Sequence, residues 1–315
     1  MNEFRVAIIG AGNMGKEHAR AFSMLEGVHV AGLASRTRAR ADAMAAELAV
    51  PLVADSVAEL YDRTRADLAV VAVPELSVSA VAKAAFACPW AVLIEKPAGY
   101  DLEDAEDIAR AAAGRQQPVM VGFNRRFYSS TRAIRDDLDT RPEETRFVHV
   151  QDQQSYAEAR RYNHPEQVVE RFMYANSIHL IDLIPVFGRG EVARVQRITP
   201  WRGGETVIMM AYVEFTSGDT ALYEGVWQGP GPWACSVSTV GKRWTMQPLE
   251  QAAYQNAGER ARHSVEVAEE DRKCKPGLLL QARAAVAKVR GASSSIPTLG
   301  DSLGTMRLIH HIFGV

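Results

Sequence analysis

Residues Arg5–Gly15 read RVAIIGAGNMG and indicate how the first part of the chain is built. The short apolar run Val6–Ile9 predicts a strand that is buried on both faces. Gly10, Gly12 and Gly15 follow it at the spacing G-x-G-x-x-G. In a strand–turn–helix of this kind the first glycine permits a tight turn, the second lets a pyrophosphate approach the backbone, and the third lets helix and strand pack closely. The stretch therefore predicts a dinucleotide site.

The surroundings of the glycines support this prediction. A helix is predicted over residues 16–25 and a second strand over Val28–Ala34, which gives the length of one βαβ unit. The free N–H groups and the dipole at the helix start favour phosphate charge. Asn13 and Met14 are expected to bind the cofactor there together with the glycines. The alternative is a glycine turn with a purely structural role, because three glycines can occur at this spacing by chance.

The end of the second predicted strand indicates which cofactor binds. Proteins that bind NAD usually carry a carboxylate about 20 residues after the glycines, where it holds the ribose 2′-hydroxyl. This chain instead has Ser35, Arg36, Arg38 and Arg40, with no Asp or Glu between residues 27 and 41. A guanidinium pairs with a 2′-phosphate, whereas a carboxylate repels it. NADP(H) is favoured over NAD(H), against the alternative that these arginines are only the solvated start of a helix.

Length and composition predict an ordinary globular protein with two domains. The 315 residues carry a net charge of −2, with 47% hydrophobic and 23% charged residues. No nucleic-acid or membrane partner is therefore expected. Cys88, Cys235 and Cys274 lack C-x-x-C spacing and the eight histidines are scattered, so no metal site is predicted. The early first strand and the absence of a long apolar run predict a cytoplasmic protein.

Strand-like and helix-like stretches alternate over the first 122 residues, which predicts a parallel sheet covered by helices on both faces. Longer strands then follow near residues 147–154, 192–199, 207–215, 221–227 and 234–240. They predict a second domain of α+β type with a mostly antiparallel sheet. We expect an α/β protein with a dinucleotide-binding domain over 1–123, a substrate-binding and oligomerisation domain over 124–300, and a C-terminal helix in 301–315 that could pack back on the first domain.

The predicted strand Val207–Phe215 is apolar at both of its alternating sets of positions. Such a pattern predicts that both faces of the second sheet are covered, one by helices and the other by a second subunit. A homodimer or homotetramer formed through this sheet is the corresponding expectation.

Charged residues follow the predicted strand 91–94, at the sheet edge where α/β enzymes keep their functional groups. Together with the glycine turn, three motifs resemble the Gfo/Idh/MocA family of oxidoreductases, and the resemblance covers essentially the whole chain. The motifs are Glu95-Lys96-Pro97, Val121-Gly122-Phe123-Asn124-Arg125-Arg126-Phe127 and His179-Leu180-Ile181-Asp182. The segment Lys275-Pro276-Gly277-Leu278 with Gln281 is similar to one in sugar-modifying members.

The resemblance implies a Rossmann domain, an open-faced C-terminal sheet, and hydride transfer between a nicotinamide and a hydroxyl or keto carbon of a sugar, nucleotide sugar or cyclitol. It implies that Lys96 is a catalytic lysine and that Glu95 lies beside the cofactor. The alternative for Lys96 is a solvated loop lysine. The expected cofactor-binding residues are Gly10, Gly12, Asn13, Met14, Gly15, Ser35, Arg36, Arg40, Val73, Pro74, Glu95, Lys96 and Asn124.

His179 and Asp182 are three residues apart, so they share a face if the stretch is a helix that starts at Asn176 or Ser177. An imidazole near a hydroxyl can take its proton as hydride leaves. The alternative is a core histidine bonded to Asp182. The expected catalytic residues are Lys96, His179 and Asp182, and the expected substrate-binding residues are Lys96, Arg126, Tyr156, Asn176 and His179.

The chain departs from the family pattern just before His179. Many members carry an aspartate three or four positions earlier, where this chain has Ala175 and Asn176. An amide cannot exchange a proton as a carboxylate does. The departure leaves Lys96 and His179 as acid–base groups, and it keeps open a non-catalytic protein that senses a dinucleotide or has a regulatory role.

Overall fold

The computed structural model describes residues 3–315. Within them the chain forms two compact units, each with its own sheet. The first contains the chain up to Asn124 together with Glu270–Leu303, and the second contains Arg125–Glu269 together with Gly304–Val315. The segment 270–303 thus clusters with the first unit, although the expected boundaries grouped it with residues 124–300.

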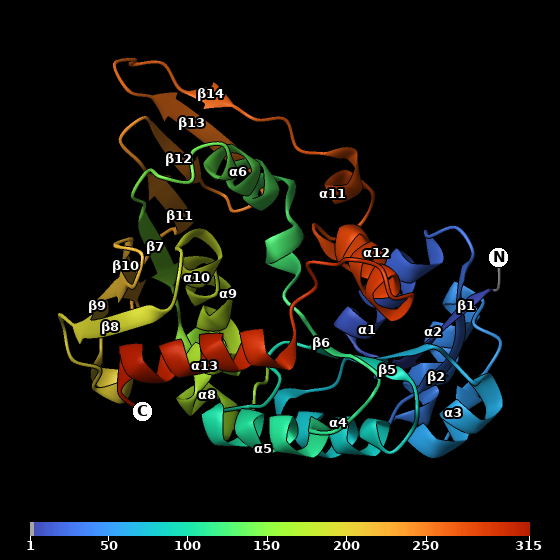
Figure 1. The fold of residues 1–315 in the computed structure, drawn as a ribbon. Helices are drawn as coiled ribbons and strands as arrows, with labels where there is room; N and C mark the ends of the chain where they lie inside the picture. The colour runs from blue at the N-terminus through green and yellow to red at the C-terminus, as the bar shows by residue number, and fades with distance from the viewer. Residues whose placement is uncertain (1–2) are drawn as a thin grey trace. The chain divides into compact units, whose positions relative to one another are not determined.

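The first unit contains a six-stranded sheet of order β3-β2-β1-β4-β5-β6, in which all strand pairs are parallel (Figure 1). Its strands are β1 (Phe4–Ile9), β2 (Val28–Ala34), β3 (Val53–Ala54), β4 (Leu68–Val71), β5 (Ala91–Glu95) and β6 (Val119–Gly122). The chain order reverses direction between β1 and β4, and ligands of such sheets bind beyond the carboxyl ends of the strands at this point. The predicted Rossmann architecture is confirmed.

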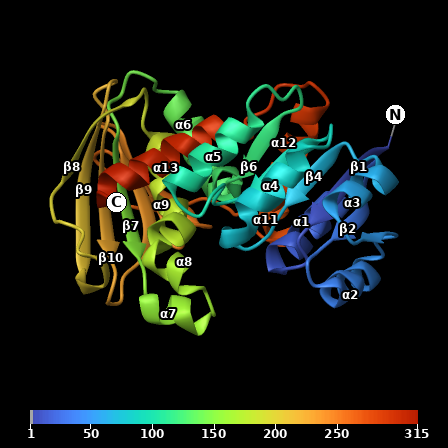
Figure 2. The ribbon, with the colours of Figure 1, turned by 90° about the horizontal axis from the view of Figure 1, so that it is seen from below.

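Helices cover both faces of this sheet. They are α1 (Asn13–Ser23), α2 (Arg38–Leu48), α3 (Val57–Thr64), α4 (Val78–Phe86), α5 (Leu102–Ala112), α11 (Glu269–Lys273) and α12 (Leu278–Val289). Helix α1 packs against α12, while α4 packs against α3 and α5. Figures 1 and 2 show α4 and α5 on the face of the sheet opposite to α1 and α12. Because both faces are covered, β4 and β5 are buried along their whole length.

The second unit contains an eight-stranded sheet of order β14-β13-β12-β11-β7-β10-β9-β8. Its strands are β7 (Phe147–Gln153), β8 (Val192–Arg197), β9 (Ile208–Phe215), β10 (Thr220–Val226), β11 (Trp233–Ser238), β12 (Lys242–Met246), β13 (Ala252–Asn256) and β14 (His263–Ser264). All of its pairs are antiparallel except β7 with β10. The mostly antiparallel sheet is as predicted, but β12, β13 and β14 were not foreseen.

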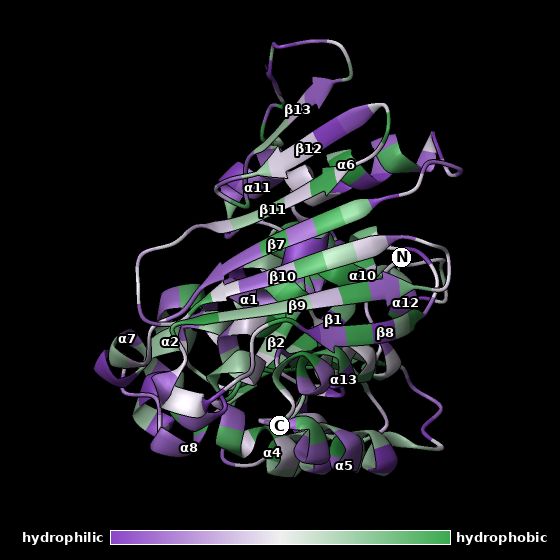
Figure 3. Ribbon diagram, turned by 90° about the vertical axis from the view of Figure 1, so that its left-hand side faces the viewer, coloured by the Kyte–Doolittle hydropathy of each residue, from purple (hydrophilic) through white to green (hydrophobic). Residues whose placement is uncertain are grey.

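The two faces of this sheet differ. In β9 the residues Met209, Ala211 and Val213 are buried, whereas Met210 and Tyr212 are half-buried. Figure 3 views the sheet with its strands toward the reader and with α6 (Ser129–Asp139) and α10 (Leu183–Phe187) behind them. Helices thus cover one face, and the cover predicted for the other face stays a prediction.

The remaining helices of the second unit are short, apart from the last. They are α7 (Tyr156–Arg161), α8 (Glu166–Glu170), α9 (Ile178–Ile181) and α13 (Leu299–Phe313), which runs through both units. A π-helical turn, Met173–Ser177, leads directly into α9. The α-helix thus begins at Ile178, directly after the predicted cap Ser177, but the backbone before it is already helical and neither Asn176 nor Ser177 caps α9 with its side chain.

A buried carboxylate fixes the turn before β10. Asp219 is fully buried and accepts hydrogen bonds from the backbone N–H groups of Arg146 (2.9 Å) and Arg189 (3.0 Å). Its two oxygens also accept from Nε and Nη2 of Arg189 at 2.8 and 2.7 Å. Burial raises the pKa of Asp219, but the hydrogen bonds from Arg189 and the backbone outweigh this effect and bring the pKa below its usual value.

In the part of the chain that the structure describes, no helix has the length and apolar character needed to cross a bilayer. Over the same residues no three His, Cys, Asp or Glu side chains gather in a way that could hold a metal ion.

Candidate cofactor and substrate sites

The glycine turn of the first unit has the geometry that its spacing predicts. Gly10 has a φ of +115°, and a Cβ there would lie 2.0 Å from the carbonyl oxygen of Ala72. A Cβ at Gly15 would lie 2.0 Å from the carbonyl oxygen of Gly10, so α1 approaches β1 as closely as a glycine allows. A Cβ at Gly12 would meet no atom within 4 Å. Gly10 and Gly15 therefore lie in tight contact with neighbouring backbone, whereas the space beside Gly12 is open.

The start of α1 fits a phosphate. Gly12 caps the helix without a side-chain hydrogen bond, and the first turn contains no acidic residue. Asn13 is exposed and Met14 half-buried. The first N–H groups of a helix have no partner within the helix, and the helix dipole adds positive potential there. The backbone at Gly12, Asn13 and Met14 thus suits the pyrophosphate of a dinucleotide.

The predicted selectors of the 2′-phosphate lie after β2. Ser35 is half-buried, and Arg36 and Arg40 are exposed. The guanidinium of Arg38 instead forms ion pairs with Asp42 (2.9 Å) and Asp55 (2.6 Å). Arg38 is thus already paired, which leaves Arg36 and Arg40 as the arginines of this segment that suit a 2′-phosphate.

The residues after β4 and β5 lie at the same edge of the sheet as the glycine turn. Val73 is half-buried and Pro74 is exposed, directly after β4. Glu95 ends β5, is 7% exposed, and has Oε1 at 2.8 Å from Nε2 of His18 in α1. Half-buried Lys96 follows, joined to Pro97 by a cis peptide bond. The structure therefore gathers the predicted cofactor residues of this unit along one edge, and His18 is a partner that the sequence did not indicate.

Asn124, another predicted cofactor residue, is hydrogen-bonded within the first unit. It is 4% exposed, and its Nδ2 donates to the carbonyl oxygen of Pro276 at 3.0 Å. Its side chain thus anchors the segment before α12. A direct contact of Asn124 with the cofactor stays a prediction.

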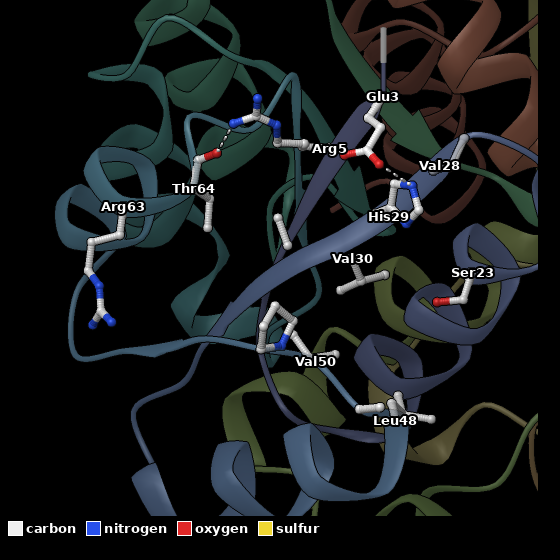
Figure 4. Close-up of a pocket in the computed structure, with 13 residues that line it drawn as sticks. Glu3, Arg5, Ser23, Val28, His29, Val30, Leu48, Val50, Arg63 and Thr64 are labelled. Atoms are coloured by element: carbon white, nitrogen blue, oxygen red, sulfur yellow. Dashed lines mark hydrogen bonds and ion pairs between the residues drawn. The ribbon is translucent and has the colours of Figure 1, made fainter. Parts of the chain in front are cut away.

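A hollow of about 530 Å³ in the first unit lies away from this edge (Figure 4). Its lining includes Glu3 and Arg5 beside the start of β1, and Val28 and His29 at the start of β2. These are the amino ends of the strands. Since ligands of such sheets bind at the carboxyl ends, this hollow is not the dinucleotide site.

In the second unit, four polar side chains form a hydrogen-bonded chain that ends at Asn176. Tyr223 donates to Oδ2 of Asp152 (2.8 Å), and Nε2 of Gln154 donates to Oδ1 of Asp152 (2.6 Å). Nδ2 of Asn176 then donates to Oε1 of Gln154 (2.8 Å). Burial raises the pKa of Asp152, and the hydrogen bonds that it accepts oppose this rise. Because the carboxylate of Asp152 can only accept from Gln154, it fixes the orientation of the Gln154 amide and, through it, that of Asn176.

Asn176 lines a hollow of about 270 Å³ together with Gln154, Tyr162 and Trp233. The imidazole of His179 is half-buried, with its centroid 6.4 Å from the ring of Trp233. The structure thus brings two predicted substrate residues, Asn176 and His179, close to the same tryptophan.

The alternative role for His179 was a core histidine bonded to Asp182, but Asp182 has other hydrogen-bond partners. Asp182 is 2% exposed, and its carboxylate accepts hydrogen bonds from Nε and Nη2 of Arg126 at 2.8 and 2.7 Å. Oγ1 of Thr305 also donates to it at 2.8 Å. A buried carboxylate held in this way positions its helix. Catalysis by Asp182 and substrate binding by Arg126 stay predictions, and each would require the residue to keep its present partner while it contacts the substrate.

Tyr156 lines a separate hollow of about 660 Å³, beside Arg160 and Trp227. Its ring centroid lies 5.2 Å from that of Trp227, and burial raises the pKa of its hydroxyl to about 12. Tyr223 and Trp227 have no exposed surface, so neither ring is open to a sugar.

Arg125 belongs to the motif Val121–Phe127, and the sequence indicated no separate role for it. Its guanidinium lies 4.7 Å from the centroid of Trp233, and its Nε and Nη1 are buried without a hydrogen-bond acceptor among the described residues. Burial lowers its pKa. Its position beside Trp233 becomes visible only once β11 is placed next to β7.

The six-stranded parallel sheet, the tight glycine turn and the uncapped start of α1 together define a dinucleotide-binding Rossmann protein. Residues 4–123 match the model of a family described as "Oxidoreductase family, NAD-binding Rossmann fold". Over these residues the chain is similar to the Gfo/Idh/MocA family, in agreement with the resemblance of its motifs.

Individual proteins are similar to part of the chain in sequence or to nearly all of it in fold. An inositol 2-dehydrogenase of Streptomyces avermitilis is 35% identical over 138 residues, which cover 43% of this chain and 40% of that protein. The matched region thus spans less than half the length of this curated relative. A dehydrogenase from Chromobacterium violaceum has the same fold, with a TM-score of 0.84 at 20% identity, over 99% of this chain and 95% of that one. A levoglucosan dehydrogenase in complex with NADH and levoglucosan gives a TM-score of 0.79 at 15% identity, over 98% and 96% of the two chains.

Proposed function

We propose that the protein is an NAD(P)-dependent oxidoreductase that acts on a hydroxyl or keto carbon of a sugar, nucleotide sugar or cyclitol. The observation that carries the proposal is the glycine turn, open beside Gly12, at the same sheet edge as Lys96. Relatives named as inositol and levoglucosan dehydrogenases support the substrate class.

The residues of this chain supply binding and proton transfer. The turn at Gly12 and the start of α1 would hold the pyrophosphate, and Val73 and Pro74 line the adjoining edge. A bound nicotinamide would supply the hydride chemistry. In the direction of oxidation, His179 takes the hydroxyl proton as the C–H hydride leaves, so that a C=O double bond forms. Lys96 is proposed to donate a hydrogen bond to the reacting substrate oxygen and to stabilise the charge that develops on it.

Asn176 and Tyr156 are proposed to contact the sugar. Nδ2 of Asn176 already donates to Gln154, so its Oδ1 remains as an acceptor for a substrate hydroxyl. We assign Asp182 and Arg126 a positioning role, because each is the other's partner. We propose that a second copy of the chain covers the half-exposed face of the second sheet in a homodimer or homotetramer.

For the cofactor we propose NADP(H), with NAD(H) as the alternative. Arg36 and Arg40 are exposed at the end of β2 and can receive a 2′-phosphate. The absence of a carboxylate among residues 28–40 supports the same choice.

The test has two stages. NADPH and NADH are first titrated against the protein by quenching of its tryptophan fluorescence. Sugars, nucleotide sugars and cyclitols are then screened with the bound cofactor for a change in nicotinamide absorbance. A protein that binds neither dinucleotide contradicts the proposal. Tight binding with no turnover on any of these substrates would instead favour a dinucleotide sensor, which the amide at Asn176 also suits.

A further inference from the structure

Lys275 lies beside the glycine turn although 261 positions separate it from Met14. Its Nζ is 3.2 Å from Sδ of Met14, the second residue of α1. Lys275 itself is exposed, and both residues belong to the first unit. A thioether is a weak acceptor, so this contact contributes little to the stability of the ammonium group. The structure thus holds a lysine at the dinucleotide-binding turn without a strong partner.

The segment that carries Lys275 is fixed at several points. Oδ1 of Asp271 accepts the N–H of Gly277 at 2.7 Å, where Gly277 adopts a φ of +77° and caps α12. Asn124 holds the carbonyl oxygen of Pro276 at 3.0 Å. Helix α12 then packs along α1. Because these contacts fix the residues on both sides of it, the position of Lys275 follows from the fold.

The charges around this position are unbalanced. The start of α1 carries positive potential from the helix dipole, and an ammonium group placed there is unfavourable unless an anion lies between them. Nearby charges are already used: Lys16 pairs with Glu47 at 2.6 Å, and Glu17 pairs with Arg20 at 2.9 Å. No described carboxylate forms an ion pair with Lys275. A bound diphosphate would satisfy both the open N–H groups and the ammonium.

We propose that Lys275 binds the pyrophosphate of the dinucleotide, opposite the backbone N–H groups of the glycine turn. The inference rests on the proposed function, because it takes the dinucleotide as the ligand. It adds a residue from the late segment 270–303 to a site otherwise built from the first 124 residues. The 2′-phosphate is a separate group, held in the proposal above by Arg36 and Arg40.

The test compares the affinity of Lys275→Met, Lys275→Arg and wild type for NADH and for NADPH by fluorescence quenching. At low ionic strength Lys275→Met should bind both cofactors about 10-fold more weakly, since one charge-assisted hydrogen bond is lost. Lys275→Arg should stay close to wild type. At high salt the gap between Lys275→Met and wild type should narrow, because exposed charges are screened.

Lys288→Met is the matched control, since Lys288 is an exposed lysine at the other end of α12. It should not change either affinity. Unchanged binding in Lys275→Met, or an equal loss in Lys288→Met, overturns the assignment. A loss confined to NADPH also overturns it, because the contact would then be with the 2′-phosphate. A wild type that binds neither dinucleotide refutes the proposed function itself, so the two failures are distinct.

Discussion

Nε2 of His18 lies 2.8 Å from Oε1 of Glu95, and both side chains are buried. His18 belongs to α1, whose start is the proposed phosphate site, and Glu95 is the last residue of β5 before Lys96. The hydrogen bond therefore joins the helix proposed to bind phosphate to the strand that precedes the proposed catalytic lysine. It also gives a buried carboxylate the partner that such a group requires.

His18→Ala should lower the free energy of unfolding by about 1–3 kcal/mol, because it leaves the carboxylate of Glu95 buried without this partner. Urea denaturation of His18→Ala, Glu95→Ala and the double variant measures the coupling between the two residues. His29→Ala is the control, since exposed His29 only pairs with Glu3 at the surface, at 3.4 Å. Additive effects of the His18 and Glu95 variants would show that the contact contributes nothing.

Arg36→Ala should weaken NADPH binding by about 1.5–3 kcal/mol and leave NADH binding unchanged, because only NADPH carries the 2′-phosphate. Arg38→Ala should have a smaller effect, since the guanidinium of Arg38 already pairs with Asp42 and Asp55. Titration of both cofactors against the three proteins checks this. Equal affinity of wild type for NADH and NADPH would reject the NADP assignment.

Lys96→Met should lower turnover by roughly 10²–10³, because the charge that develops on the substrate oxygen loses a stabilising donor. Cofactor affinity should stay within a few fold of wild type. Lys83→Met serves as the control, because Lys83 is an exposed lysine that pairs with Asp107. Steady-state rates and cofactor titrations are measured side by side. A Lys96→Met protein with the wild-type rate would identify Lys96 as an ordinary loop lysine.

Asn176→Asp should bring no gain in turnover. Its new carboxylate would face Oε1 of Gln154, whose own amide is held by Asp152, so an acceptor would oppose an acceptor. The added charge would also keep the imidazole of His179 protonated and unable to act as a base. His179→Ala should reduce turnover by roughly 10²-fold or more.

Paired rates of wild type, Asn176→Asp and His179→Ala, on whichever sugar the screen identifies, check this expectation. The informative contrary result is a wild type that binds NADPH but turns nothing over, and that Asn176→Asp activates. The protein would then be a sensor that lost catalysis through this position.

Asp219→Asn should destabilise the protein by about 1.5–3 kcal/mol at neutral pH, because hydrogen bonds from Arg189 to a charged acceptor are lost. The folded-state pKa of Asp219 is below its usual value. Its contribution is therefore complete above pH ~4, the pKa of an unfolded aspartate, and is lost as the pH falls through the folded pKa.

Urea midpoints of wild type and Asp219→Asn, measured from neutral pH downward, should converge below pH ~4. Asp42→Asn removes an exposed pair with Arg38 and should change stability little at any of these pH values. A difference between wild type and Asp219→Asn that does not depend on pH would mean that the charge of Asp219 is unimportant.

The parallel sheet and the glycine turn could be predicted because their signals are local. Buried runs such as Val6–Ile9, each followed by a helix, repeat along the first 122 residues. The late segment gave no such signal: α12 is apolar on most sides, and its return to α1 depends on contacts made only in the folded chain. The π-helical turn Met173–Ser177 likewise has no sequence pattern of its own.

The sequence could predict which residues are candidates for the site, but not which side chains form hydrogen bonds with one another. The sequence indicated Lys96, His179 and Asn176 as candidates, because each lies in or just before a contiguous motif, and their roles remain predictions. It could not show that Arg126 and Asp182, 56 positions apart, use each other as partners. Nor could it show that Arg38 pairs with Asp55, because such contacts depend on where β3 lies beside β2.

The edge of the parallel sheet at β6 is paired by a much later part of the chain. Val121 donates its N–H to the carbonyl oxygen of Pro297 at 2.8 Å, and Met120 forms an antiparallel bridge with Thr298. During synthesis, β6 therefore leaves the ribosome nearly 180 residues before its partner does. Until then its backbone is an unpaired edge, which is the kind of surface on which nascent chains associate wrongly and chaperones act.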